Sequence, residues 1–169
     1  MVFQFVPLSI LLVVSAAVSL GISLYAWKHE LTPYATPFSL YFLGLFVWAL
    51  AQFLHINALS LESKRIFLFI EFAAITATPW AWFAFVYYFL YYHKKKGVMP
   101  LWLFLPVTLG WNLFIFTDPL HHLYWQSFRI TRVGDVQFLS ADPGLGFMLF
   151  SIYVYGILIA SWILLLRKR

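Results

Sequence analysis

The sequence predicts an all-α membrane protein: a five-helix transmembrane bundle with a β-hairpin in the loop between its fourth and fifth helices. The chain has 169 residues, of which 63% are hydrophobic and only 10% are charged. A soluble domain of this size needs a polar surface, and only a bilayer removes that need. In addition, five apolar stretches fill nearly the whole chain. Each approaches or exceeds the ~20 residues that cross ~30 Å of hydrocarbon.

The expected transmembrane segments follow these stretches in order. They cover residues 6–27, 37–58, 65–92, 100–117 and 146–166. Pro37 and Pro100 suit the first turn of a helix, where the missing N–H has no partner to lose. Pro79 and Pro106 lie inside the third and fourth segments, where they should kink the helix and free backbone carbonyls. We expect residues 1–169 to form one transmembrane domain.

The basic residues predict the orientation. The larger group contains both dense clusters: Lys28, Lys94, Lys95, Lys96, Arg167, Lys168 and Arg169. A smaller group falls on the opposite side: Lys64, Arg65, Arg129 and Arg132. The positive-inside rule then places the N-terminus outside and the C-terminus in the cytoplasm, in a multi-pass protein of the cell (plasma) membrane. Because orientation accounts for the net charge of +5, no nucleic-acid partner is expected.

The long connection over residues 118–145 becomes extracellular in this topology. Its middle, Phe128–Leu139, alternates apolar and polar side chains on both sides of Gly134 and Asp135. Such alternation around a Gly-Asp pair predicts a β-hairpin. An ordered external loop on a helical bundle is also a common place for binding residues.

Glu71 is the only acidic residue inside an expected helix. A carboxylate in the middle of a bilayer costs ~2.5–3.5 kcal/mol on insertion scales, and less near the interface. We therefore expect Glu71 to be protonated, paired or facing a wet cavity. It is either a ligand contact or proton-linked switch, or a hydrogen-bonded structural residue near the interface.

Other polar residues should lie at the same outer level as Glu71. The candidate ligand-binding or switch residues are Glu71, His55, Asn112, Asp118, His121, His122 and Trp125. Such a cluster could bind a metal, sense pH, or simply bond to water and lipid headgroups. No His-x-x-x-His spacing appears, so no metal site is predicted, and pairing of Asp118 with one of the two adjacent histidines is favoured. We expect this layer to form the outer mouth of a pocket among the second, third and fourth segments.

Several chemistries find no support in the sequence. The chain has no Cys, which excludes disulfides, a thiol nucleophile and thiolate metal ligands. No lysine lies mid-helix to form a retinal Schiff base, and no histidines lie deep on two facing helices to bind haem. Phosphate-binding glycine loops and nucleophile motifs are also missing. We therefore expect no cofactor and assign no catalytic residue.

Four segments occur in a recognisable order. They are Leu45–Leu50 (LFVWAL), Ile70–Phe85 with its central Pro79, Asn112 followed by Thr117–Trp125, and Gly144–Phe147 followed by Tyr153 and Tyr155. Each motif is weak alone, but together they cover nearly the whole chain. Their order resembles the N-terminal seven-helix sensor domain of membrane-bound histidine kinases.

This resemblance implies a sensory input module that passes an extracellular or membrane stimulus to the cytoplasm. In that family the domain continues through two more helices to a kinase or a cyclic-dinucleotide synthase. Kinase activity is therefore not assigned to these residues. We expect either a piece of a longer sensor or a free-standing five-helix relative that signals through a partner.

The partners that this reading implies are the lipid bilayer, a small-molecule or lipid ligand, and a second copy or a membrane partner protein. The alternative function is a small structural or assembly subunit of a membrane complex, with its aromatic faces as the interface. A transporter ranks last, because the chain shows no repeat symmetry and only one buried carboxylate.

Overall fold

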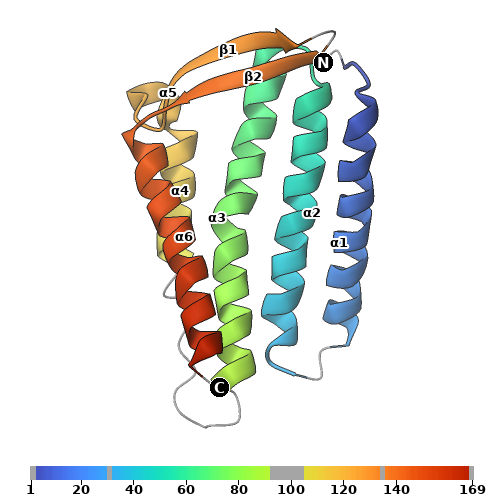
Figure 1. The fold of residues 1–169 in the computed structure, drawn as a ribbon, viewed down its shortest axis with the longest axis vertical. Helices are drawn as coiled ribbons and strands as arrows, with labels where there is room; N and C mark the ends of the chain where they lie inside the picture. Colours follow the sequence, from blue (N-terminus) through green and yellow to red (C-terminus); the bar gives the residue numbers. More distant parts are fainter. Residues whose placement is uncertain (1–2, 30–31, 92–104, 134–135, 168–169) are drawn as a thin grey trace.

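The computed structural model describes residues 3–29, 32–91, 105–133 and 136–167. These residues are mostly helical, with one two-stranded sheet (Figure 1). The elements, in chain order, are η1 (Pro7–Ser9), α1 (Ile10–Lys28), α2 (Ala35–Asn57), α3 (Leu61–Tyr91), α4 (Leu105–Phe116), α5 (Asp118–His121), β1 (Trp125–Val133), β2 (Val136–Pro143) and α6 (Leu145–Leu166).

Four helical segments are long and apolar enough to cross a membrane. They are Pro7–Lys28, Ala35–Asn57, Leu61–Tyr91 and Leu145–Leu166. The described part of α4 has 12 residues, fewer than the ~20 that a full crossing needs. The start of the expected 100–117 segment, including Pro100, lies outside the described residues. The fifth crossing therefore stays a prediction.

The start of α3 differs from the expected boundary. The helix begins at Leu61, one turn before Arg65. Ser60 explains the earlier start, because its Oγ accepts the Ser63 N–H at 3.1 Å and so satisfies one of the N–H groups left free at a helix start. Glu62 in the first turn adds a negative charge where the helix dipole favours one.

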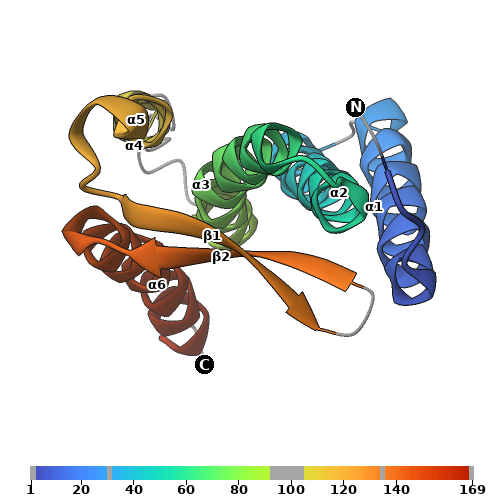
Figure 2. The ribbon, with the colours of Figure 1, turned by 90° about the horizontal axis from the view of Figure 1, so that it is seen from above.

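Seen from above, α1, α2 and α3 form a row, and α4 and α6 lie beyond α3 (Figure 2). Helix α3 is central, since it packs against α2, α4 and α6. Gly44 permits a very close approach of α2 and α3, because a Cβ at this position would overlap the Thr78 Oγ1.

The hairpin lies across one end of the bundle, here called the hairpin end, and the first described residues lie there too (Figure 1). Strands β1 and β2 pair antiparallel, with Ile130 opposite Leu139 and an irregularity between Trp125 and Ser127. The predicted hairpin is thus confirmed, with strands longer than the expected 128–139. The expected turn residues Gly134 and Asp135 lie outside the described residues.

An aromatic core fixes the hairpin to the helices. Its buried members are Leu68, Phe72, Ile115, Tyr124, Trp125 and Phe150. The Phe72 ring meets the Trp125 ring edge-on, with 5.2 Å between their centroids, a favourable geometry for aromatic pairs. Helices α3, α4 and α6 and the start of β1 therefore share one core.

Asn57 ties the N-terminal segment to the end of α2. Its Oδ1 accepts the Val6 N–H at 2.8 Å, and its Nδ2 donates to Ser9 Oγ at 2.9 Å. The Asn57 carbonyl also accepts the Gln4 N–H at 2.8 Å. These contacts satisfy backbone groups that would otherwise lie unpaired near an apolar environment.

Candidate functional site

The Glu71 carboxylate is paired with α2. His55, in the last turn of α2, places its Nδ1 2.7 Å from Glu71 Oε1. Both residues are buried, with 9% of His55 and 4% of Glu71 exposed. A carboxylate only accepts hydrogen bonds, so His55 Nδ1 carries the proton in this contact. The expectation that Glu71 is paired is met by a residue of the predicted set.

Gln52 completes the environment of Glu71. With its amide nitrogen turned to the carboxylate, that nitrogen lies 2.8 Å from Oε2 and 3.2 Å from Oε1. This orientation satisfies both groups, because the amide nitrogen donates and the carboxylate accepts. Gln52 was not among the predicted residues, although it lies three residues before His55 and hence on the same face of α2.

Lys64 is fully buried next to this pair, with 0% of the residue exposed. Its Nζ donates to the carbonyl oxygens of His55 at 3.0 Å, Ile56 at 3.5 Å and Gln137 at 2.8 Å. The first two belong to the last turn of α2, where free carbonyls and the helix dipole favour a cation. The third belongs to β2. Lys64 therefore joins α2, α3 and the hairpin. In the sequence it served only to predict the orientation of the bundle, so this structural role was not predicted.

A second polar group organises the turn between α4 and β1. Asp118, of which 1% is exposed, accepts the backbone N–H groups of Tyr124 at 2.7 Å and Trp125 at 3.2 Å through its Oδ1. Burial and then the nearby Asp118 charge raise the pKa of the Tyr124 hydroxyl above its ordinary value. Helix α4 ends at Phe116, and Asp118 and Pro119 begin the short helix α5.

His121 lies beside Asp118, as favoured, with 3.7 Å between its Nδ1 and Asp118 Oδ1. This nitrogen accepts the Leu123 N–H at 3.1 Å, so it offers no proton to the carboxylate. The opposite nitrogen, Nε2, donates to the Phe114 carbonyl at 3.2 Å. His121 therefore holds the turn together through both of its ring nitrogens.

The side chains of the remaining predicted residues lie outside these two polar groups. Asn112 donates to Thr76 Oγ1 at 2.8 Å and links α4 to α3. Trp125 is part of the aromatic core. His122 is exposed and has a left-handed backbone with φ 54°. Within the described ranges, no three His, Cys, Asp or Glu residues are grouped to hold a metal.

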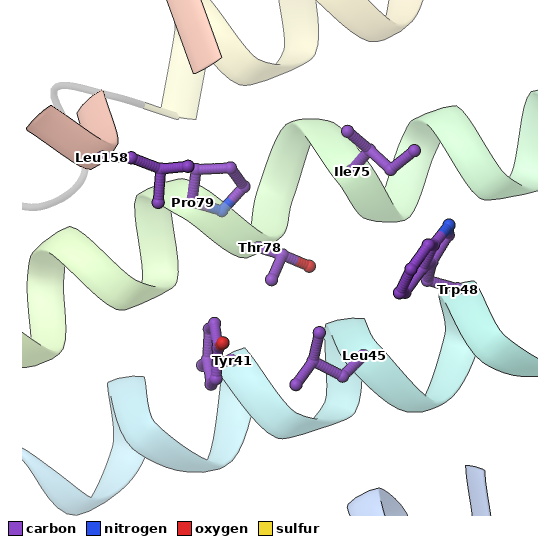
Figure 3. Close-up of a pocket in the computed structure, with 7 residues that line it drawn as sticks. All are labelled: Tyr41, Leu45, Trp48, Ile75, Thr78, Pro79 and Leu158. Carbon is purple, nitrogen blue, oxygen red and sulfur yellow. The ribbon is translucent and has the colours of Figure 1, made fainter. Parts of the chain in front are cut away.

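A pocket lies between α2, α3 and α6 (Figure 3). Its volume is about 220 Å³, and it is lined by Tyr41, Leu45, Trp48, Ile75, Thr78, Pro79 and Leu158. The α2 residues lie at i, i+4 and i+7 and therefore on one face of that helix. None of the lining side chains carries a charge. This pocket differs in place from the one expected among the second, third and fourth segments.

Comparison with known families agrees with this architecture. Residues 11–169 match a family described as the N-terminal 7TM region of histidine kinase. No curated protein and no solved structure matches the chain. The match covers well over half of the chain, and the four membrane-length helices agree with a membrane-spanning region. The chain belongs to the family of N-terminal seven-transmembrane regions of histidine kinases.

Proposed function

We propose that this chain is the sensory input module of a histidine-kinase-type signalling protein, and that it passes an extracellular or membrane stimulus to the cytoplasm. Membership of the family supports the role of an input module. The observation that carries the proposal is the buried Glu71 carboxylate, which is held by two side chains of the neighbouring helix, His55 and Gln52.

Signalling across a membrane needs two arrangements of the bundle whose free energies differ by a few kcal/mol. The contacts of Glu71 join α2 and α3 at the hairpin end, so sliding one helix past the other breaks all of them together. Hydrogen bonds to a charged group contribute about 1.5–3 kcal/mol each, which is the right size to bias such an equilibrium.

Helix α3 also contains a point where it can deform. Pro79 lies inside the helix and lacks an N–H, so the Ile75 carbonyl four residues earlier has no ladder partner. A change at Glu71 therefore has a path along α3, through a weakened turn, to the opposite end of the bundle. We place that opposite end in the cytoplasm of a multi-pass protein of the cell membrane.

The test is made in the complete signalling protein that carries this region, in membrane vesicles. Autophosphorylation is compared between the wild type, Glu71→Gln and Gln52→Ala. We expect both variants to change the basal rate by about fivefold or more, because a shift of ~1 kcal/mol in the equilibrium has that effect. Glu62→Gln is the matched control, since Glu62 is an exposed acidic residue at the start of the same helix.

Two results would count against the proposal. One is folded Glu71→Gln protein whose output equals that of Glu62→Gln. The other is a chain that copurifies in fixed ratio with a membrane complex and whose loss leaves phosphotransfer unchanged. The second result would support the assembly-subunit alternative.

A further inference from the structure

We propose that the pocket between α2, α3 and α6 binds a neutral one-ring molecule with a hydroxyl or carbonyl oxygen, which enters from the bilayer. The pocket sits near the middle of α3, beside the close contact of Gly44 with Thr78 and beside Pro79. It therefore lies at a close approach of α2 and α3 and next to the proline inside α3.

The size of the pocket selects a single ring. Its volume is about 220 Å³, whereas an apolar cavity of about 150 Å³ holds benzene. A ring with one or two small substituents fits this space. The two acyl chains of a phospholipid do not fit in it.

The walls suit a flat apolar body. Tyr41 and Trp48 are seven residues apart on α2, which corresponds to ~10 Å along the helix axis, and Leu45 lies between them (Figure 3). The Tyr41 ring is itself packed against Trp82, at 5.3 Å between centroids. Aromatic rings at the two ends and aliphatic side chains between them favour an aromatic ligand through offset or edge-on contacts.

Two hydroxyl groups supply the polar recognition. Thr78 Oγ1 donates its own proton to the Ala74 carbonyl at 2.8 Å, so its lone pairs are available to accept from a ligand hydroxyl. Tyr41 comes from the facing helix and brings a phenolic O–H that can donate to a hydroxyl or carbonyl oxygen. Because no charged side chain lines the pocket, an ionised ligand would be left unpaired there, which selects a neutral one.

This inference rests on the proposed function and deepens it, because a ring wedged against Thr78 and Pro79 would bias how α2 packs on α3. Its test is a binding measurement, which is independent of signalling. The chain in nanodiscs is titrated at neutral pH with 4-bromophenol, whose bromine quenches tryptophan fluorescence at contact. Partitioning into lipid gives quenching that rises without saturation, whereas binding in the pocket adds a saturable component.

We expect the saturable component to disappear in Trp48→Phe, because this ring lines the pocket. Leu45→Phe fills the space and should weaken binding tenfold or more, a loss of ~1.4 kcal/mol or greater. Leu43→Phe is the matched control, since Leu43 is on the same helix, 39% exposed and not in the lining. Bromobenzene, which lacks the oxygen, should bind the wild type about tenfold more weakly.

Three results would overturn the proposal. The first is quenching of the wild type that never saturates, a result that does not depend on the folding of any variant. The second is a saturable component that Leu45→Phe leaves intact while its circular dichroism matches that of Leu43→Phe. The third is equal affinity for bromobenzene and 4-bromophenol, which would remove the role of the hydroxyl groups. In each case the autophosphorylation test of Glu71 stands unaffected.

Discussion

Glu71 shows how one ionisable side chain is accommodated in an apolar bundle. Its two oxygens face the donors of His55 and Gln52, so the hydrogen bonds that water would have made are replaced within the protein. Lys64 meets the same demand with three backbone carbonyls. Buried charges are tolerated when they are fully hydrogen-bonded, and removing one side of the arrangement is costly.

The first prediction compares two substitutions of this carboxylate. Glu71→Gln should lower the free energy of unfolding by about 1 kcal/mol, because Gln52 can turn its amide and keep a hydrogen bond with the new amide. Glu71→Lys should cost ~3–5 kcal/mol, since it leaves a cation unpaired next to His55 and Lys64. Unfolding in mixed micelles with increasing denaturing detergent measures both. Equal losses for the two variants would contradict the pairing.

The sequence could predict that Glu71 needs a partner, but it could not name both partners. The insertion cost predicted that Glu71 is protonated, paired or facing a wet cavity, and His55 was among the candidates because it ends a helix at the same level. Gln52 was missed, because the amide of a glutamine in an apolar helix can also find other hydrogen-bond partners, and the sequence does not single out Glu71 among them. Lys64 lies seven residues before Glu71, two helical turns, and this spacing was a usable signal for a shared buried face.

The second prediction concerns Asp142 in β2. Hydrogen bonds from Ser127 and Arg129 hold the pKa of Asp142 below its ordinary value, which is ~3.9 in an unfolded chain. A carboxyl whose folded pKa is depressed contributes stability above the unfolded pKa, and this contribution is lost as pH falls through the folded pKa. The strand pair should therefore loosen below about pH 4.

Backbone NMR shifts of Ser127 and Arg129, recorded in nanodiscs between pH 7 and pH 2, measure this loosening. Asp142→Asn keeps an acceptor oxygen without a titrating charge, so its strand signals should be independent of pH over the same window. Wild-type signals that also stay unchanged below pH 4 would show that the Asp142 contacts do not hold the strands.

The hairpin and the long helices could be read from the sequence because each has a periodic or continuous pattern. Alternation around the Gly-Asp pair predicted the strand pair, and uninterrupted apolar runs predicted α1, α2, α3 and α6. The packing between elements has no such pattern. Gly44 is one of eight glycines, and only the structure shows that it faces Thr78. The same limit applies to the candidate layer, whose side chains separate into a Glu71 group that contacts α2 and an Asp118 group in the turn before β1.

The third prediction tests the close contact of α2 and α3. Gly44→Ala should destabilise the bundle by ~1–3 kcal/mol, because the added Cβ overlaps the Thr78 Oγ1. Gly44→Ala combined with Thr78→Ala should recover most of this loss, since the overlapping oxygen is then absent. Gly21→Ala in α1 is the control: nothing lies within 4 Å of its Cβ, and alanine favours the helix by up to ~1 kcal/mol.

Detergent-induced unfolding of the wild type, Gly44→Ala, Thr78→Ala and the double variant provides the double-mutant cycle. The coupling energy between the two substitutions should be stabilising, because Thr78→Ala reduces the loss of stability that Gly44→Ala causes. If Gly44→Ala is as stable as Gly21→Ala, then α2 and α3 do not approach each other as closely as the structure shows.

The last prediction concerns the orientation of the bundle in the membrane. The first described residues and the hairpin share one end, and α6 ends at the other (Figure 1). Arg167 follows α6 directly, the next two residues in the sequence are Lys168 and Arg169, and the positive-inside rule places such basic clusters in the cytoplasm. The sequence assigns the smaller basic group, Lys64, Arg65, Arg129 and Arg132, to the hairpin side. Lys64 is buried in hydrogen bonds to carbonyls, so it contributes less to that side's exposed charge. A C-terminal fluorescent reporter that matures only in the cytoplasm should therefore be bright, and a periplasm-active phosphatase at the same position should be silent. A phosphatase inserted between β1 and β2 should give the opposite result. Reversed activity at both sites would show that the bundle has the opposite orientation. The Glu71 group would then lie on the cytoplasmic side, where no extracellular stimulus could reach it directly.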